Sequence, residues 1–313
     1  MRIVIAVGGN ALLKEDQRGT WADQLESARP VAEAVVALRR EGHEVVLTHG
    51  NGPQVGTLML QHAMGEPQVP ALPLHALGAM TQGDLGYLLQ MSISEIDPGV
   101  PSATILTRVR VADDDPAFDN PTKPVGPFYS EADARRLSRD RGWVVGEDSG
   151  RGWRCMVASP RPVEILELEQ IRVLAESGSV VIAGGGGGIP VSTRDGTLAG
   201  MAAVIDKDRC SAELGLALGF DLLVLLTAVP RVVVDFGTRW ERPLWHMSVA
   251  ETRRLLAAGE FPPGSMGPKI ESAERFATGG GRAAIITDAA SLMAAIHGED
   301  GTWIQAEQEA VLL

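Results

Sequence analysis

Cysteine is scarce in this sequence, with two among 313 residues, Cys155 and Cys210. Two isolated thiols provide neither the spacing of a metal-binding motif nor a disulfide framework. We therefore expect both to be reduced and buried, as in a cytoplasmic protein. Long apolar runs are also missing. The run at residues 3–7 is too short for the core of a secretory leader, and no run reaches the roughly 18 residues of a membrane-spanning helix. We expect a cytoplasmic protein without a membrane partner.

The sequence has fewer positively charged residues than negatively charged ones. The 28 Lys and Arg residues face 40 Asp and Glu residues, which gives a formal net charge of −12. Such a chain is a poor general binder of nucleic acid, because neutralising phosphates requires clustered cations. A local positive pocket can still hold a small anion. The 45% of apolar residues and 22% of charged residues are typical of a folded globular protein, and they exclude an intrinsically disordered chain.

Several common catalytic motifs are absent. The sequence has no Gly-x-x-x-x-Gly-Lys-Ser/Thr motif, and the five glycines at 184–188 do not complete Gly-x-Gly-x-x-Gly. These absences argue against a P-loop nucleotidase and a dinucleotide site. It also lacks Gly-x-Ser-x-Gly and His-Glu-x-x-His, so neither a hydrolase nucleophile nor that zinc site is indicated. Six histidines show no clustered spacing, and the acidic run at 113–115 fits a solvated loop better than a metal site.

Short β-branched runs alternate with segments of helical period, which predicts an α/β sheet covered by helices. Strands are expected at 3–7, 44–48, 103–111, 179–183, 221–226 and 283–287. Helices are expected at 28–40, 53–64, 76–92, 199–218, 248–257, 267–278 and 289–297. Residues 112–162 are rich in Asp, Pro, Gly and Arg, and we interpret them as an inserted subdomain. Five aromatic residues could form its small core: Phe118, Phe128, Tyr129, Trp143 and Trp153.

Three glycine-bearing turns follow expected strands: Gly8-Gly9-Asn10, Gly50-Asn51-Gly52 and the run at 184–188. Glycine lets a ligand approach the backbone closely. The N–H groups at a strand-to-helix turn form a cradle for an anion. In an open parallel sheet, ligands bind beyond the carboxyl ends of the strands. One such turn is weak evidence, but three together predict a phosphorylated ligand.

Lysine is rarer than arginine, and three of the four lysines lie in conspicuous places: Lys123 between Thr122 and Pro124, Lys207 between two aspartates, and Lys269 after Gly267-Pro268. Positioned positive charge is what phosphoryl transfer needs, because negative charge spreads over the equatorial oxygens of the transition state. An aspartate between two such lysines would hold their ammonium groups in place and keep them protonated.

These residues belong to longer strings that resemble the carbamate kinases of the amino acid kinase family. The resemblance covers essentially the whole chain. The segments around Lys123 and around Gly150–Arg154 are the most specific to the carbamate kinase branch. The matching strings are at 4–12, 48–56, 120–128, 147–148, 150–154, 185–191, 203–208, 264–266 and 268–269.

The resemblance implies one amino acid kinase domain over residues 1–313. It would be a three-layer αβα sandwich with a mostly parallel central sheet and a small protruding subdomain at about 112–162. The implied reaction is ATP + carbamate ⇌ ADP + carbamoyl phosphate, with Mg²⁺ bound through the nucleotide phosphates, in a homodimer. The N-terminal part would hold carbamate and the transferred phosphoryl group, and residues 180–313 would hold ATP or ADP.

The resemblance also implies roles for individual residues. Gly8, Gly9 and Asn10 would contact the transferred phosphate, and Gly50 and Asn51 would contact carbamate. Lys207 and Lys269 would stabilise the transition state, Asp206 would organise them, and Lys123 would reach the substrate from the subdomain. Nucleotide-binding positions would be Gly185, Gly186, Thr227 and Met266. Carbamate is already an anion, so no general base is required, which fits the absence of a catalytic dyad.

Some positions depart from the family pattern. They include His75, Asp84, Arg108, Arg110, Cys155, the loop at 228–231, and Val234 with Asp235. Two alternatives therefore stay open. One is a kinase of the same fold for another small carboxylate or phosphate acid. The other is a weakly active regulator that binds nucleotide or carbamoyl phosphate. The combination of Asp206, Lys207 and Lys269 argues against the regulator, because binding alone does not need a transition-state clamp.

Overall fold

An eight-stranded sheet runs through the computed structural model, which describes residues 1–12, 17, 19–66, 68–148, 150–194, 196–262 and 266–306. Its strands are parallel except where β16 pairs with β17. The strand order is β15 (His246–Ser248), β17 (Thr302–Gln305), β16 (Ala283–Thr287), β12 (Leu222–Leu226), β1 (Arg2–Val7), β2 (Glu44–His49), β9 (Val180–Ile182) and β3 (Ser102–Thr104). The predicted mostly parallel central sheet is confirmed.

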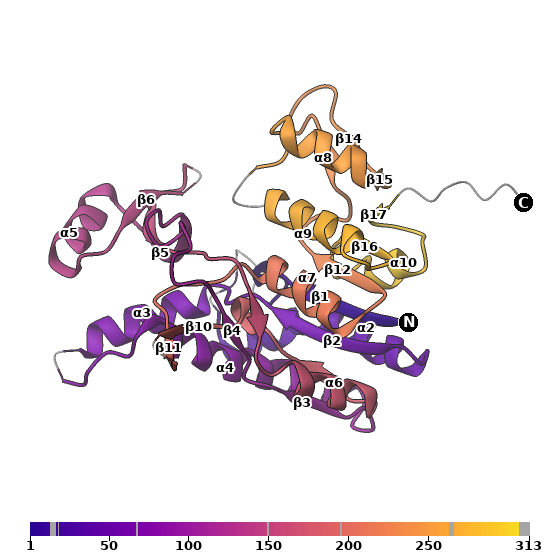
Figure 1. Ribbon diagram of the computed structural model, residues 1–313, viewed down its shortest axis with the longest axis horizontal. Coiled ribbons are helices and arrows are strands. Elements are labelled where there is room, and N and C mark those ends of the chain that lie inside the picture. The colour runs from indigo at the N-terminus through magenta and orange to yellow at the C-terminus, as the bar shows by residue number, and fades with distance from the viewer. Residues whose placement is uncertain are drawn as a thin grey trace, which may run out of the picture.

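Helices cover both faces of this sheet (Figure 1). Successive residues of β1 alternate between two separate cores, with Val4 and Ala6 in one and Ile3, Ile5 and Val7 in the other. The first core packs against α6 (Leu168–Glu176), α7 (Lys207–Leu218), α8 (Val249–Ala257) and α9 (Met266–Thr278). The second packs against α2 (Trp21–Arg40), α4 (Leu74–Ile96) and α10 (Leu292–Ile296). Because strand side chains point alternately to the two faces, this gives the expected αβα sandwich.

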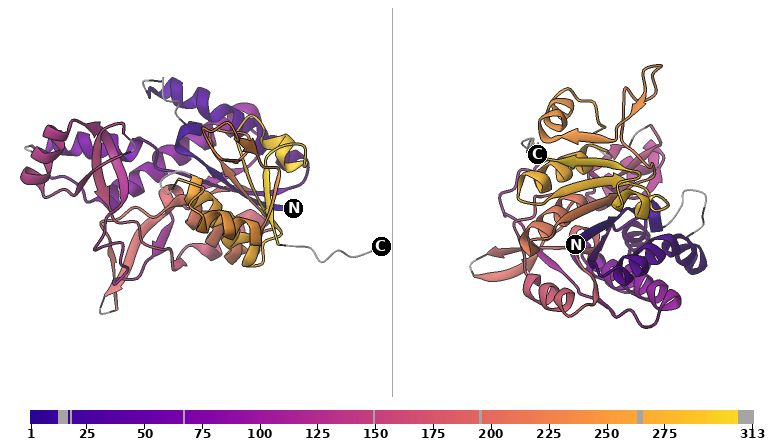
Figure 2. Two further views of the ribbon diagram at one scale, coloured as in Figure 1. Left: turned by 90° about the horizontal axis from the view of Figure 1, so that it is seen from above. Right: turned by 90° about the vertical axis from the view of Figure 1, so that its right-hand side faces the viewer.

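A small subdomain projects from one end of the sandwich (Figure 2). It is a three-stranded antiparallel sheet of β5 (Lys123–Tyr129), β7 (Trp153–Val157) and β6 (Val145–Glu147), with α5 (Glu131–Arg141) beside it. The helix α3 (Gln54–Gly65) contacts it. The sheet spans residues 123–157, which lie within the segment 112–162 that was interpreted as a subdomain. Phe118 packs on the main core, whereas Trp143 packs in the subdomain core of Val125 and Cys155.

The helix expected at 28–40 begins earlier, at Trp21, and two other expected elements differ in kind from the structure. The strand expected at 103–111 is two strands in different sheets, β3 and β4 (Arg108–Arg110). The break lets the Thr107 backbone pair with both Gln82 and Ile189. The helix expected at 199–218 begins at Lys207. The preceding residues form a hairpin of β10 (Ile189–Arg194) and β11 (Thr197–Gly200), which the sequence analysis missed. This hairpin joins β4 and β8 (Glu164–Ile165) in a second sheet.

The remaining elements are short: α1 (Gly9–Leu12), the 3₁₀ turn η1 (Gly185–Gly187), and the hairpin of β13 (Val233–Val234) and β14 (Arg242–Pro243). Within the ranges given above, no helix has the length and apolar character needed to cross a bilayer.

Candidate functional site

A cavity of about 1130 Å³ lies at the carboxyl ends of β1, β2 and β12, between the sandwich and the subdomain. Two of the predicted glycine turns, at Gly8-Gly9 and at Gly50 to Gly52, line it together with Gly186. From the subdomain come Lys123 to Phe128, Arg151 and Arg154, and from α7 and α9 come Lys207, Asp208 and Lys269. The structure thus brings together, around one space, most of the residues that the sequence analysis singled out.

The glycines of these turns allow close backbone packing. A Cβ atom on Gly8 would lie 2.9 Å from the carbonyl oxygen of Leu226, and one on Gly9 would lie 3.0 Å from the Cα of Gly52. A Cβ atom on Gly50 would lie 3.2 Å from Cδ of Lys207. The turns after β1 and β2 therefore touch each other and the stem of Lys207. The predicted residue Asn10 lies in α1, but its side chain is outside the described part of the structure.

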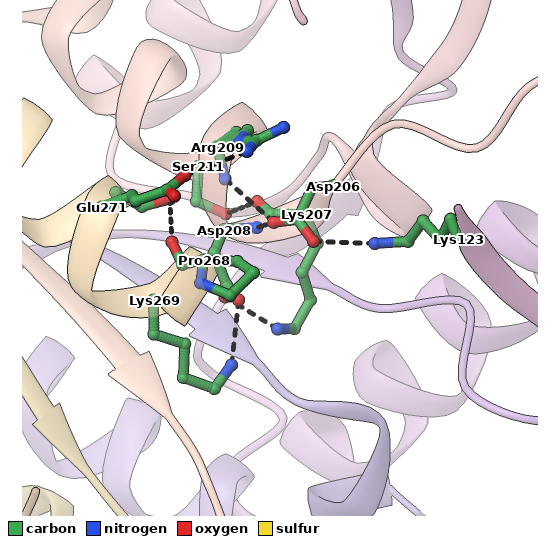
Figure 3. A network of polar contacts seen from close by, with 10 residues as sticks. Lys123, Asp206, Lys207, Asp208, Arg209, Ser211, Pro268, Lys269 and Glu271 are labelled. Carbon is green, nitrogen blue, oxygen red and sulfur yellow. Dashed lines mark hydrogen bonds and ion pairs between the residues drawn. The ribbon is translucent and has the colours of Figure 1, made fainter. Parts of the chain in front are cut away.

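Asp208 bridges two lysines with its two carboxylate oxygens. Nζ of Lys207 donates to Oδ1 at 2.7 Å, and Nζ of Lys269 donates to Oδ2 at 2.9 Å (Figure 3). Asp208 and Lys269 are buried, and the Lys207 side chain is 13% exposed. Charge-assisted hydrogen bonds of this kind fix the positions of both ammonium groups. Asp208 is the organising residue that the sequence analysis missed, although its place directly after Lys207 was a visible signal.

Asp206 makes its direct contacts with the start of α7 and with the subdomain. It is the N-cap of α7: its Oδ1 accepts the backbone N–H groups of Asp208 at 2.9 Å and Arg209 at 3.3 Å. This capping turns Oδ2 toward the subdomain, where it accepts a hydrogen bond from Nζ of Lys123 at 2.7 Å (Figure 3). Capping the helix thus directs the Asp206 carboxylate to Lys123, and an organising role of Asp206 for Lys207 and Lys269 stays a prediction.

Burial and charge act against each other on the protonation of this cluster. Burial raises the pKa of the Asp206 carboxyl, but the charges of Lys123 and Lys207 outweigh it and hold the pKa well below its usual range. Burial lowers the pKa of Lys207, but Asp208 and Asp206 reverse this, and the net direction is upward. For Lys269, burial and the charge of Lys207 outweigh the attraction of Asp208, and its pKa falls to about 8. The pKa of Asp208 is also lowered, by Lys207 and Lys269 against the effect of burial, so both aspartates are ionised, and Lys269 is nearer to losing its proton than Lys207.

Asn51 lies in the cavity and is held from α4. The hydroxyl of Thr81 donates to Oδ1 of Asn51 at 2.7 Å. Gly186 faces the same side chain, since a Cβ atom there would lie 2.0 Å from Asn51 Oδ1. Gly186, which was predicted to bind nucleotide, therefore lies beside Asn51, which was predicted to bind carbamate.

Two predicted nucleotide-binding residues do not line the cavity. Gly185 packs against His49, because a Cβ atom there would lie 2.3 Å from the imidazole Nε2, and its carbonyl accepts a hydrogen bond from the Gln82 amide at 2.8 Å. Met266, the first residue of α9, packs against the main core. Thr227 lines the cavity at the end of β12. Contacts of Gly185 and Met266 with nucleotide stay predictions.

His49 anchors the second glycine turn. It is buried, and its Nδ1 lies 2.9 Å from the carbonyl oxygen of Gly50. Burial lowers the pKa of His49 to about 4, so the ring is neutral near pH 7. A neutral, buried ring in contact with the turn is suited to anchoring this loop.

The departures from the family pattern fall into two groups. Arg108 and Arg110 form ion pairs with Glu167 and Glu164 at 2.7 and 2.5 Å, and the His75 ring packs against Gly200. These positions are away from the cavity. Asp84 and Ala228, in contrast, line it. Burial raises the pKa of the Asp84 carboxyl. Asp84 and Ala228 are therefore the departures that directly border the space for a ligand.

The fold and the site together are those of a phosphotransferase. Comparison with known proteins shows the family to which the chain belongs. The model of the amino acid kinase family matches residues 1–288. The chain belongs to the amino acid kinase family. A curated carbamate kinase from Pyrococcus horikoshii is 44% identical over 311 residues, covering 97% of this chain and 98% of the relative. One from Clostridium perfringens is 43% identical, covering 97% and 99%.

The solved structures agree with the sequence relatives. Carbamate kinase from Giardia lamblia bound to AMP-PNP is 37% identical, with a TM-score of 0.90 and coverage of 98% of both chains. The same Giardia protein bound to citric acid gives a TM-score of 0.92. The similarity therefore extends over the sandwich and the subdomain alike.

Proposed function

We propose that the chain is a carbamate kinase that catalyses ATP + carbamate ⇌ ADP + carbamoyl phosphate. The observation that carries this proposal is the pair of lysines on one buried carboxylate, Lys207 and Lys269 on Asp208, beside two glycine turns in a single cavity. Relatives that are named carbamate kinases over almost their whole length support the choice of carbamate as the acceptor.

In the proposed reaction, a carbamate oxygen attacks the γ-phosphorus of ATP, and the bond from that phosphorus to the bridging oxygen of ADP breaks. The attacking oxygen is already anionic, so no general base takes a proton. Lys207 and Lys269 balance the charge that spreads over the transferred phosphoryl group. Asp208 fixes both ammonium groups before the substrate arrives, and this preorganisation avoids a reorganisation cost in the transition state.

The acceptor side would be formed by Gly50, Asn51 and Gly186, with Gly8 and Gly9 around the transferred phosphate. Lys123 would exchange its ion pair with Asp206 for contact with the substrate. Such an exchange would make substrate capture depend on the position of the subdomain, because Lys123 is the first residue of β5. The nucleotide would enter past Thr227 and Ala228, from the C-terminal half of the sheet.

Mg²⁺ would be held mainly by the nucleotide phosphates. Asp206 and Asp208 both bind lysines, and in the described ranges no group of three His, Cys, Asp or Glu could hold a metal ion. A metal that keeps phosphate oxygens and waters as ligands is compatible with these residues. When bound, it supplies further charge neutralisation on the phosphates.

A homodimer and a cytoplasmic location complete the proposal. One exposed stripe of α4 carries Met80, Tyr87 and Met91, and the Tyr87 ring stacks on Trp21 with centroids 5.5 Å apart. Such an apolar stripe supports self-association, which the molar mass of the purified protein in solution would test. The free, buried thiols of Cys155 and Cys210 support a reducing compartment.

The test is ATP formation from ADP, Mg²⁺ and carbamoyl phosphate by the purified protein. Turnover that depends on all three components would support the proposal. Binding of ADP without turnover would overturn it. The next candidate would then be a kinase for another small acid, which Asp84 and Ala228 in the cavity wall favour, and a panel of small carboxylates and phosphate acids would identify its acceptor.

A further inference from the structure

The proposed mechanism leaves one motif without a role. Gly150-Arg151-Gly152-Trp153-Arg154 lies on the protruding subdomain, and two of its side chains, Arg151 and Arg154, reach the cavity together with Phe128. The motif was singled out as characteristic, but the sequence analysis assigned no function to either arginine.

Arg154 is held firmly in place. Its side chain is 18% exposed. Nε donates to the carbonyl oxygen of Gly126 at 2.9 Å, and Nη1 donates to Oδ2 of Asp148 at 3.0 Å. The guanidinium carbon also lies 5.1 Å from the centre of the Phe128 ring. These contacts use two of the five N–H donors of the group, so its orientation is fixed while others can bind a ligand.

The backbone around Arg154 is irregular where these contacts form. The pairing of β5 with β7 shifts between Val125 and Tyr129, and Gly126 within this stretch has φ of 79°. Gly152 has φ of 132°, and a Cβ atom there would lie 3.2 Å from the Tyr129 carbonyl oxygen. Bulges often redirect a side chain beside an active site. Here the irregularity presents the Gly126 carbonyl to Arg154 and sets Phe128 beneath the guanidinium group.

The charges in the cavity show why further cations are useful. Three lysines line it, but so do three aspartates, Asp84, Asp206 and Asp208, so the lysines give the cavity no excess of positive charge when all three carboxyls are ionised. A phosphate ester or acyl phosphate carries nearly two negative charges near pH 7. Among the lining residues that the structure describes, the remaining cations are Arg151 and Arg154. Arg151 also lies over Phe128, at 5.0 Å, and its side chain is 56% exposed.

We propose that Arg154, with Arg151 beside it, binds the phosphate group of carbamoyl phosphate on the subdomain side of the cavity. This inference rests on the proposed function for the identity of the ligand. A planar guanidinium group matches the oxygens of a phosphate with paired hydrogen bonds, which an ammonium group cannot do. The subdomain thereby contributes a binding site for the acyl phosphate in addition to Lys123.

The experiment compares Arg154→Met with Arg141→Met in steady-state kinetics. Arg141 is a matched control on the same subdomain: it pairs with Glu66 at 3.2 Å and lies 5.9 Å from the Trp143 ring, but it does not line the cavity. Arg154→Met should raise KM for carbamoyl phosphate about tenfold or more, the factor expected when a hydrogen bond between charged groups is lost. KM for ADP should stay within about twofold. An equal KM for carbamoyl phosphate in both variants would overturn the inference.

A second measurement separates this inference from the proposed function. Calorimetric titration of inorganic phosphate into the full-length protein needs no turnover. Phosphate should bind at least about fivefold more weakly to Arg154→Met than to the wild type or Arg141→Met. Arg154→Lys keeps the positive charge, so its affinity for phosphate should lie between those of the wild type and Arg154→Met. If the wild type forms no ATP but phosphate binding still depends on Arg154, the proposed function fails and the anion site stands. If the wild type forms ATP and phosphate binds equally to all variants, the anion site is wrong.

Discussion

Gly56 and Gly126 pack backbone against backbone where α3 meets the protruding subdomain. A Cβ atom on Gly56 would lie 2.2 Å from the Cα of Gly126, so no other residue fits at position 56 without moving the subdomain. The subdomain carries Lys123, Arg151 and Arg154 into the cavity. This close contact therefore helps to position the strand that begins with Lys123 relative to α3.

Replacing Gly56 with alanine should displace the subdomain. Overpacking of this kind costs about 1–3 kcal/mol, and KM for carbamoyl phosphate should rise several-fold as the cations move. Gly65→Ala is the matched control, because Gly65 belongs to the same helix and a Cβ atom there would meet nothing within 4 Å. Urea unfolding and kinetics of both variants provide the measurement. Equal behaviour of the two variants would contradict the proposed importance of the contact.

Removing the charge of Lys207 should impair the chemical step. We expect Lys207→Ala to lower kcat by about 10²-fold or more, the scale observed when one preorganised electrostatic contact is removed. Arg209→Ala is a suitable control, because Arg209 lies on the same helix but pairs with Glu271 near the surface. Activity of Lys207→Ala within a few-fold of the wild type would exclude Lys207 from the mechanism.

The bridge formed by Asp208 gives a separate prediction. In Asp208→Asn, two lysines lose their shared countercharge, so their ammonium groups repel each other and are no longer fixed. We expect kcat to fall by about 10-fold to 100-fold, while KM for ADP changes less. Glu271→Gln removes a carboxylate from the neighbouring surface pair without touching the bridge. Full activity of Asp208→Asn would show that the lysines need no organising residue.

The proton on Lys269 predicts an alkaline limb in the pH profile. Burial and Lys207 lower its pKa to about 8, and the ammonium form is the one that stabilises the transferred phosphoryl group. As pH rises through about 8, the free enzyme loses this charge, so kcat/KM should fall. Lys269→Arg keeps the charge at every accessible pH, and its profile should stay flat over that range. The same limb in both proteins would assign it to another group.

Much of the sandwich could be predicted because its strands are short, apolar and bounded by glycine. The buried β1 and β12 were recognisable in this way. The segment at 103–111 was not, because one apolar run contributes to two sheets, and the break depends on distant partners of Thr107. The start of α7 was missed for the opposite reason: residues 199–206 contain good helix formers, but tertiary pairing of β11 with β10 determines their conformation.

The site was predicted at the level of motifs but not of contacts. Local sequence placed Lys207 between two carboxylates, yet it could not say which oxygen meets which ammonium group. That assignment depends on Asp206 capping α7, which leaves Asp208 for the lysines. Gly185 and Gly186 are neighbours with the same residue type, but one packs on His49 and the other faces Asn51. Only the fold of the turn distinguishes them.

The scarcity of lysine has a practical consequence for chemical labelling. Of four lysines, three line the cavity, and the fourth, Lys14, lies outside the described residues. Among the residues that the structure describes, the side-chain cations outside the cavity are arginines and histidines. Amine-directed reagents such as acylating probes therefore have targets within the substrate cavity, with Lys14 and the N-terminal amine as the remaining primary amines. In this protein, a reagent normally used to map surfaces becomes a probe of ligand occupancy.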